Sequence, residues 1–146
     1  MAKNNKNNRD DESTNYNDVT NKIKNLKQLS DLSTKDIADE GGYADKVAKG
    51  SKKLKTNQLR KFFGAVRLIE QKTTWDEIEP EFYLLKPKLA VAVGRDNVPK
   101  AFYNFMMAAM AKVDVGSEEE KMKNFKTFID FFESIVAYHK YHYPKN

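Results

Sequence analysis

The chain has 146 residues, 40% of them hydrophobic and 12% aromatic, which is enough to bury the core of one domain, and its net charge is +5. The absence of cysteine excludes disulfides, thiolate catalysis and metal sites built on cysteine. The longest apolar run, residues 105–111, is too short to span a membrane, and without an apolar N-terminal segment we expect a cytoplasmic protein.

The N-terminal part of the chain changes character near residue 18. Residues 1–17 are polar and rich in Asn, so we expect a disordered tail, followed by a single helical domain over residues 18–146. Apolar residues then recur at helical spacing from Val19 to Leu29. Ser33 is a candidate N-cap for a second helix, which the pair Gly41–Gly42 should weaken or split.

The clearest helical pattern follows a lysine-rich link over residues 52–55. Thr56 is its candidate N-cap, and the apolar residues that follow recur at helical spacing. Arg60, Gly64 and Arg67 fall on a different stripe, so the two arginines should project from one face about two turns apart. Because glycine destabilises a helix, Gly64 is tolerated most easily where another helix or a ligand approaches closely.

The next segment predicts a helix that contains two prolines. Thr74 and Glu77 match a capping box, and Pro80 is a candidate for the first residue of the helix proper. Pro87 should kink or interrupt this helix, because proline lacks an N–H and crowds the preceding turn. Residues 94–97 then indicate a stop, followed by the cap of a new helix.

The last predicted element is also the longest. Ser117 and Glu120 match a second capping box, and the apolar stripe behind them continues to about His142, so we expect this helix to be central. The chain shows no strand-type alternation and no hairpin signal. The sequence therefore predicts an all-α fold, a compact bundle of five to six helices.

Basic residues are concentrated in one segment. Eight of the 26 fall between positions 46 and 69, a window that contains no Asp or Glu. The remaining 18 basic and 21 acidic residues leave the rest of the chain with a net charge of −3. Such segregation favours an anionic partner that docks at one place, with nucleic acid the usual candidate. The alternative is a solvated loop and helix face without a partner.

Nothing in the sequence points to a catalytic or metal centre. His139 and His142 lie three residues apart, a spacing that can hold a metal, but no third ligand stands near them in the sequence. The acidic cluster Glu118–Glu120 occupies the first turn of a helix, where negative charge complements the helix dipole. We therefore expect no enzymatic activity, no bound metal and no cofactor.

Three blocks of sequence carry a family resemblance. They are Lys55-Thr-Asn-Gln-Leu-Arg-Lys-Phe-Phe63, Leu85-Lys-Pro-Lys-Leu-Ala-Val-Ala-Val-Gly-Arg95 and Phe131-Phe-Glu-Ser-Ile-Val-Ala-Tyr-His-Lys140. In this order they resemble the small subunit of type III-A CRISPR effector complexes, the Csm complex. The first block resembles the family's Thr-x-Gln-hydrophobic-Arg-Lys-aromatic signature, at residues 56–62.

The resemblance implies a small, non-catalytic helical bundle, several copies of which line one side of a ribonucleoprotein filament. The implied partners are target RNA paired with guide RNA, the backbone RNase subunit, the large subunit and further copies of the chain, without a membrane. Contacts to RNA would be made to phosphates and be independent of sequence, because pairing with the guide supplies specificity. The resemblance assigns RNA contact to Lys52, Lys53, Lys55, Arg60, Lys61, Arg67 and Arg95.

Other interpretations stay open at this point. The basic segment would also suit a DNA-binding domain of the helix-turn-helix type, or a protein–protein adaptor whose lysines only solvate its surface. Arg60 could form a salt bridge instead of an RNA contact, and Arg95 could bond carbonyl groups at a helix end. Gln58 could cap its helix or contact a phosphate.

Overall fold

The computed structural model describes residues 16–146, which contain helices and no strands. Residues 16–24 are helical. The elements that follow are the 3-10 helix η1 (Leu29–Asp31) and the α-helices α2 (Thr34–Ala38), α3 (Tyr43–Lys49), α4 (Thr56–Glu70), α5 (Trp75–Gly94), α6 (Lys100–Ala111) and α7 (Glu118–His142). The predicted fold class, an all-α bundle, is confirmed.

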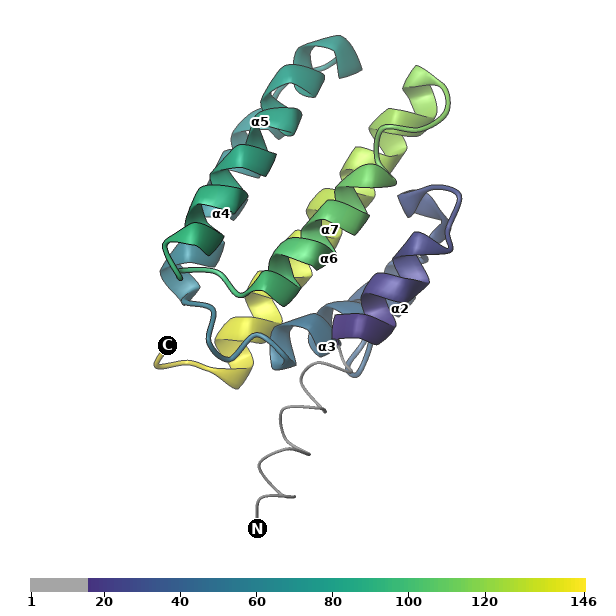
Figure 1. Cartoon of the computed structure of the whole chain (residues 1–146). Coiled ribbons are helices and arrows are strands. Elements are labelled where there is room, and N and C mark those ends of the chain that lie inside the picture. The colour runs from purple at the N-terminus through teal and green to yellow at the C-terminus, as the bar shows by residue number, and fades with distance from the viewer. Residues whose placement is uncertain (1–15) are drawn as a thin grey trace.

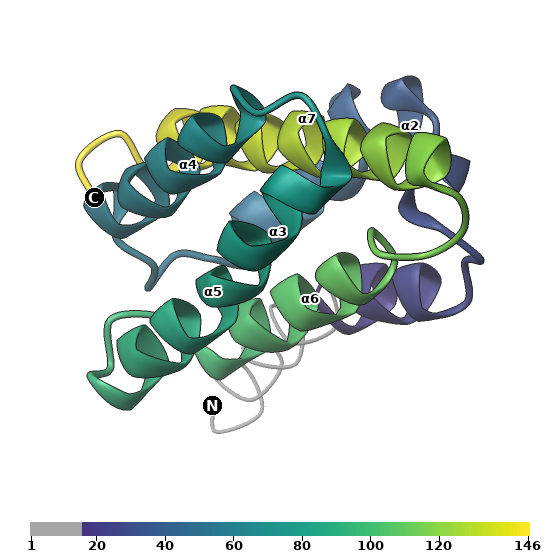
Figure 2. The ribbon, with the colours of Figure 1, turned by 90° about the horizontal axis from the view of Figure 1, so that it is seen from above.

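The helices pack around α7. Helices α4 and α5 form an antiparallel hairpin along one side of the molecule (Figure 1). Seen from above, α7 and α4 lie along one side, α6 lies along the other, and α5 crosses between them (Figure 2). Helix α7 contacts α2, α3, α4, α5 and η1, so its predicted central position is confirmed.

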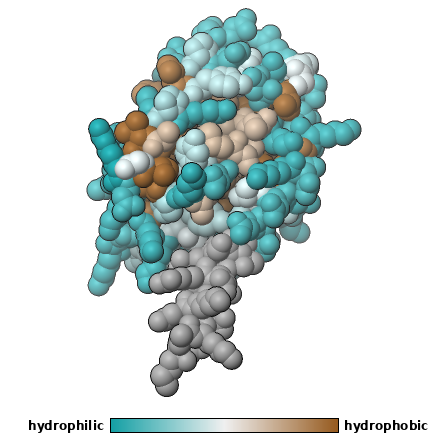
Figure 3. All heavy atoms as spheres, in the orientation of Figure 1, coloured by the Kyte–Doolittle hydropathy of each residue, from teal (hydrophilic) through white to brown (hydrophobic). Residues whose placement is uncertain are grey.

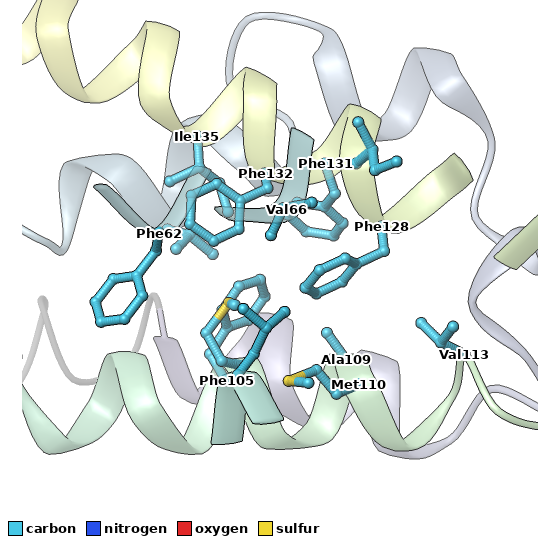
Figure 4. Packing of buried hydrophobic residues seen from close by; sticks show 14 of the residues in the cluster. Phe62, Val66, Phe105, Ala109, Met110, Val113, Phe128, Phe131, Phe132 and Ile135 are labelled. Atoms are coloured by element: carbon cyan, nitrogen blue, oxygen red, sulfur yellow. The ribbon is translucent and has the colours of Figure 1, made fainter. Parts of the chain in front are cut away.

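The core is built on the aromatic face of α7. Phe128 and Phe132 are one turn apart on this helix and almost fully buried, and they point toward α6 (Figure 4). The Phe128 ring lies edge-on to Phe82 of α5, with the ring centroids 5.7 Å apart. The Phe132 ring lies 6.4 Å from Phe102 of α6 and stacks on Phe63 of α4 at 5.8 Å. One helix thus ties the α4–α5 hairpin to α6.

Three predicted helix starts are confirmed by their capping bonds. The Glu77 N–H donates to the Thr74 hydroxyl at 3.3 Å. The Asp36 N–H donates to the Ser33 hydroxyl at 3.0 Å. The Glu120 N–H donates to the Ser117 hydroxyl at 3.2 Å, and the Ser117 N–H donates to the Glu120 carboxylate at 3.3 Å, which completes the capping box. These side chains satisfy N–H groups that have no partner within the first turn of a helix.

The glycine pair splits the second predicted helix into α2 and α3. Gly42 lies so close to the end of α2 that a Cβ atom there would stand 2.4 Å from the Asp36 carbonyl oxygen. Gly41 has a φ of +78°, which favours glycine. The predicted weak point is therefore a tight turn between two short helices.

The proline-containing helix differs from its prediction. Helix α5 begins at Trp75, five residues before Pro80, and continues through Pro87 to Gly94. Pro87 and Tyr83 are both exposed, so the Tyr83 carbonyl, which Pro87 cannot bond, remains available to water. Buried side chains before and after Pro87 hold the helix to the core, which outweighs the missing hydrogen bond; these are Phe82, Leu85 and Leu89.

Trp75, the first residue of α5, is 2% exposed, and its indole N–H has no hydrogen-bond partner among the described residues.

The stop predicted at residues 94–97 is confirmed, but the cap predicted there is wrong. Asp96 has a φ of +63°, and the N–H groups of Asn97 and Val98 bond back to the Ala92 carbonyl at 2.8 and 3.3 Å. These residues therefore close α5 instead of opening the next helix. Helix α6 starts after Pro99, its N-cap.

The predicted tail over residues 1–17 lies outside the described residues, except for Tyr16 and Asn17, which are helical. Tyr16 is 3% exposed, and its hydroxyl contacts the Ser51 hydroxyl beside the lysine-rich link. The packed helical part thus includes Tyr16, two residues before the predicted boundary, because Tyr16 supplies both an apolar ring and a hydroxyl with a partner.

We expect the substitution Tyr16→Phe to lower the free energy of unfolding by about 1–2 kcal/mol, because the Ser51 hydroxyl would lose a buried partner. Tyr141→Phe is the matched control, since Tyr141 is 77% exposed, and it should leave stability unchanged. Urea denaturation of both variants measures the difference. Equal stability of the two variants would show that the Tyr16 hydroxyl contributes nothing.

Candidate nucleic-acid interface

The basic segment, residues 46–69, comprises the end of α3, a loop over residues 50–55 and α4. Most of its apolar members are buried, with Leu54 and Leu59 fully inaccessible to solvent, whereas Leu68 is exposed. Its cations point outward. All eight have exposed side chains: Lys46, Lys49, Lys52, Lys53, Lys55, Arg60, Lys61 and Arg67.

The loop within this segment is anchored by a buried histidine of α7. The His139 ring is fully buried, and its Nε2 lies 3.0 Å from the Ser51 carbonyl oxygen. Because a carbonyl only accepts, Nε2 carries the proton and Nδ1 is left to accept from the Thr56 hydroxyl, 3.4 Å away. Thr56 therefore faces inward as the first residue of α4, and the predicted N-cap position belongs to Lys55.

The C-terminal residues fix the rest of the loop backbone. The Asn146 side-chain amide donates to the carbonyls of Lys52 and Leu54, at 2.6 and 3.1 Å. The Tyr143 hydroxyl donates to the Lys49 carbonyl. Because the carbonyls of Ser51, Lys52 and Leu54 are held by His139 and Asn146, the loop lysines project from a fixed backbone.

His142 makes a second link, to the start of α3. Its Nε2 is hydrogen-bonded to the Asp45 carboxylate, which also accepts the Gly41 N–H at 2.8 Å. Partial burial raises the pKa of Asp45, but the bonds from His142 and Gly41 outweigh it and hold this pKa below 3.8. Both histidines of the predicted pair thus serve as anchors of α3 and the loop. Among the described residues, no group of three His, Asp or Glu side chains could hold a metal ion.

The outer face of α4 carries the two predicted arginines. Arg60 and Arg67 are exposed on one side of the helix, as the spacing predicts. Arg67 forms an ion pair with Glu70 at 3.3 Å and lies 5.6 Å from the Phe63 ring centroid, so its charge is partly neutralised. Arg60 has no ion pair within residues 16–146, which makes it the freer cation.

Gly64 lies between these arginines on open surface. A Cβ atom at Gly64 would meet nothing within 4 Å. The close approach that the sequence predicts at Gly64 is therefore absent from the described part of the chain.

A hollow separates α4 from the carboxyl end of α5. Its volume is about 360 Å³, and its lining includes Lys61 and Arg95, two of the predicted contact residues. Arg95 is the C-cap of α5, and its backbone N–H bonds the Val91 carbonyl at 2.9 Å. Gln58 does not cap α4 but lines the same hollow. Lys88 also lines the hollow and was not predicted.

The seven predicted contact residues thus form a strip and not one cluster. From Lys55 to Arg67 the strip follows α4 for about 18 Å. Lys52 and Lys53 extend it into the loop at one end, and Arg95 joins it across the hollow. Phosphates spaced along an RNA backbone would suit such a strip better than a single compact anion.

A family model described as Csm2 Type III-A matches residues 31–145, most of the chain. The chain belongs to the Csm2 type III-A family. Comparison with curated proteins and with solved structures gave no match. The Csm2 match includes α2 to α7 and all three blocks that carry the sequence resemblance.

Membership of the Csm2 family confirms the predicted identity. The chain is a small subunit of a type III-A effector and works within a Csm complex. This family is one of small, non-catalytic subunits. In the part of the chain that the structure describes, no helix is long and apolar enough to cross a membrane.

We expect the stability of this Csm2 chain to fall as the pH decreases below about 6.5. Burial lowers the pKa of His139 below 6.5, so in this range the unfolded chain binds a proton more readily than the folded chain. The stability that the neutral ring contributes is complete above pH 6.5 and is lost as the pH falls toward the folded pKa. The melting temperature between pH 8 and pH 5 measures this dependence.

His139→Gln provides the matched control, because its amide can still donate to the Ser51 carbonyl but does not titrate. At pH 8 we expect the His139→Gln variant to melt at a lower temperature than the unsubstituted chain, and its melting temperature should depend less on pH. A variant with the same slope as the unsubstituted chain would exclude His139 as the source.

We expect Gly64→Ala to stabilise the isolated chain by up to about 1 kcal/mol, because α4 has room for the methyl group and alanine favours a helix. Thermal unfolding measures this gain. A loss of stability would show that the surface at Gly64 is not open in solution.

Proposed function

We propose that several copies of this subunit hold target RNA, paired with the guide RNA, through phosphate contacts that do not depend on sequence. The observation that carries the proposal is the basic segment, whose eight cations are all exposed and whose window contains no carboxylate. Membership of the Csm2 family supports it, because the family places the chain within an RNA-guided effector.

The anchored loop supports contact with phosphates in particular. Its backbone carbonyls are bonded to His139 and Asn146, so the lysines Lys52, Lys53 and Lys55 are presented outward. The ammonium group of lysine and the guanidinium group of arginine can bind a phosphate without contacting a base, and therefore without sequence preference. Each copy needs only a few such contacts, since copies arranged along one RNA add their weak affinities.

We propose the remaining partners on the same basis. The chain would contact the backbone RNase subunit, the large subunit and further copies of itself, and would act in the cytoplasm without catalysing cleavage. All acidic residues of the chain lie outside the basic segment, so RNA and protein partners can bind different surfaces of the subunit.

We expect Arg60→Glu to weaken capture of target RNA by the assembled complex at least about tenfold, because one charge-assisted phosphate contact contributes about 1.5–3 kcal/mol. Arg67→Glu should have a smaller effect, because Glu70 already pairs with Arg67. RNA binding to the purified complex at several salt concentrations measures both. The slope of log affinity against log salt should become shallower by about 0.7 for each phosphate that the variant no longer neutralises.

Lys123→Glu with Lys126→Glu is the control, since both lysines are exposed on α7, outside the basic segment. This control should assemble and capture RNA normally. If Arg60→Glu also leaves both the affinity and the salt slope unchanged in a complex of normal composition, the proposed RNA contact is wrong.

A further inference from the structure

The hollow between α4 and α5 has the composition of a small-molecule site. Its apolar lining, called its floor below, comprises Phe62 and Ala65 of α4 with Ala92 and the exposed Val91 of α5. Figure 3 shows a hydrophobic area on the side of the molecule formed by these two helices, bordered by hydrophilic side chains. At about 360 Å³, the hollow falls within the size range of ligand sites, which are mostly apolar with a few polar groups.

The rim of the hollow is positive. Lys61, Lys88 and Arg95 line it from both helices, and no carboxylate is among the lining residues. None of these three cations forms an ion pair within residues 16–146. Like charges that converge without a counter-ion favour an anionic ligand, so charge complementarity selects a phosphate or carboxylate group at the rim.

The rim also offers neutral hydrogen-bonding groups. The Gln58 and Asn97 amides line the hollow, and each can both donate and accept. Asn97 is held in place by its backbone, because its N–H bonds the Ala92 carbonyl at 2.8 Å in the turn that closes α5. An apolar floor, polar amides and three cations match the three parts of a nucleotide: the flat face of the base, its polar edge and its phosphate.

We propose that this hollow binds one unpaired, unstacked nucleotide of the RNA, with the base on the apolar floor and the phosphate between Lys61, Lys88 and Arg95. The proposal rests on the proposed function, in that it takes RNA as the ligand, but it adds a contact to a base. The subunit would then hold RNA both by phosphates along α4 and by one inserted base beside α5.

The test uses the full chain, which is small enough for amide NMR spectra. Adenosine 5′-monophosphate is added at millimolar concentration, and ribose 5-phosphate and inorganic phosphate serve as probes that lack the base. We expect shifts of amides in residues 58–65 and 88–97, with affinity for ribose 5-phosphate at least about fivefold lower than for the nucleotide. Ala65→Phe, which fills the hollow, and Lys88→Ala, an exposed change that spares the fold, should each abolish these shifts.

Three results would overturn the proposal. Equal affinity for all three probes would make the hollow a site for anions only. An absence of shifts would remove the site altogether. If Ala65→Phe prevents assembly of the complex while nucleotide shifts are absent, the hollow is a contact for a protein subunit instead.

Arg60→Glu separates this proposal from the proposed function. Arg60 is not among the residues that line the hollow, so nucleotide shifts should persist in this variant while RNA capture by the complex weakens. Persistent shifts with undiminished capture would contradict the phosphate role of α4 and leave the nucleotide site standing. An absence of shifts in the unsubstituted chain, together with weakened capture by the Arg60→Glu complex, would contradict the nucleotide site alone.

Discussion

The packing of phenylalanine rings along α7 holds the α4–α5 hairpin and α6 in one bundle. Phe128 and Phe132 contact rings from three other helices, so α7 links α4, α5 and α6 through its aromatic face. The same helix continues to His139, which bonds both the loop and the first residue of α4. Because one rigid element carries the core and the anchor, a change that loosens the core also displaces the exposed lysines.

The sequence is sufficient to predict elements whose signals are local. Capping pairs such as Ser117 with Glu120, and the long apolar stripe behind them, define α7 without reference to the rest of the chain. Pro87 is the opposite case, because a local rule predicts an interruption and core contacts on both sides keep α5 continuous. Thr56 is a second such case. A local rule makes it the N-cap of α4, whereas the fold brings its hydroxyl to His139, which the sequence does not place near it.

In the candidate site, too, some features follow from local sequence and others arise only from the fold. Exposure of the basic segment follows from its charge, and the seven contact residues taken from the family resemblance are all exposed. The sequence does not single out Lys88, because only the packing of α5 beside α4 shows that Lys88 and Lys61 line one hollow. The ion pair of Arg67 with Glu70 was open to prediction from their spacing, whereas the anchoring of the loop by Asn146 joins residues more than 90 positions apart.

Trp75 lies at the α4–α5 turn, at the end of the molecule opposite the basic loop and the C-terminus (Figure 1). It is the only tryptophan in the chain, and its buried ring lies 5.6 Å from that of Phe82. Its fluorescence is therefore an intrinsic reporter of the core, which changes when water reaches the indole on unfolding. A phosphate bound at the distant loop leaves that emission unaltered, so a single optical signal separates a variant that no longer binds its ligand from one that no longer folds.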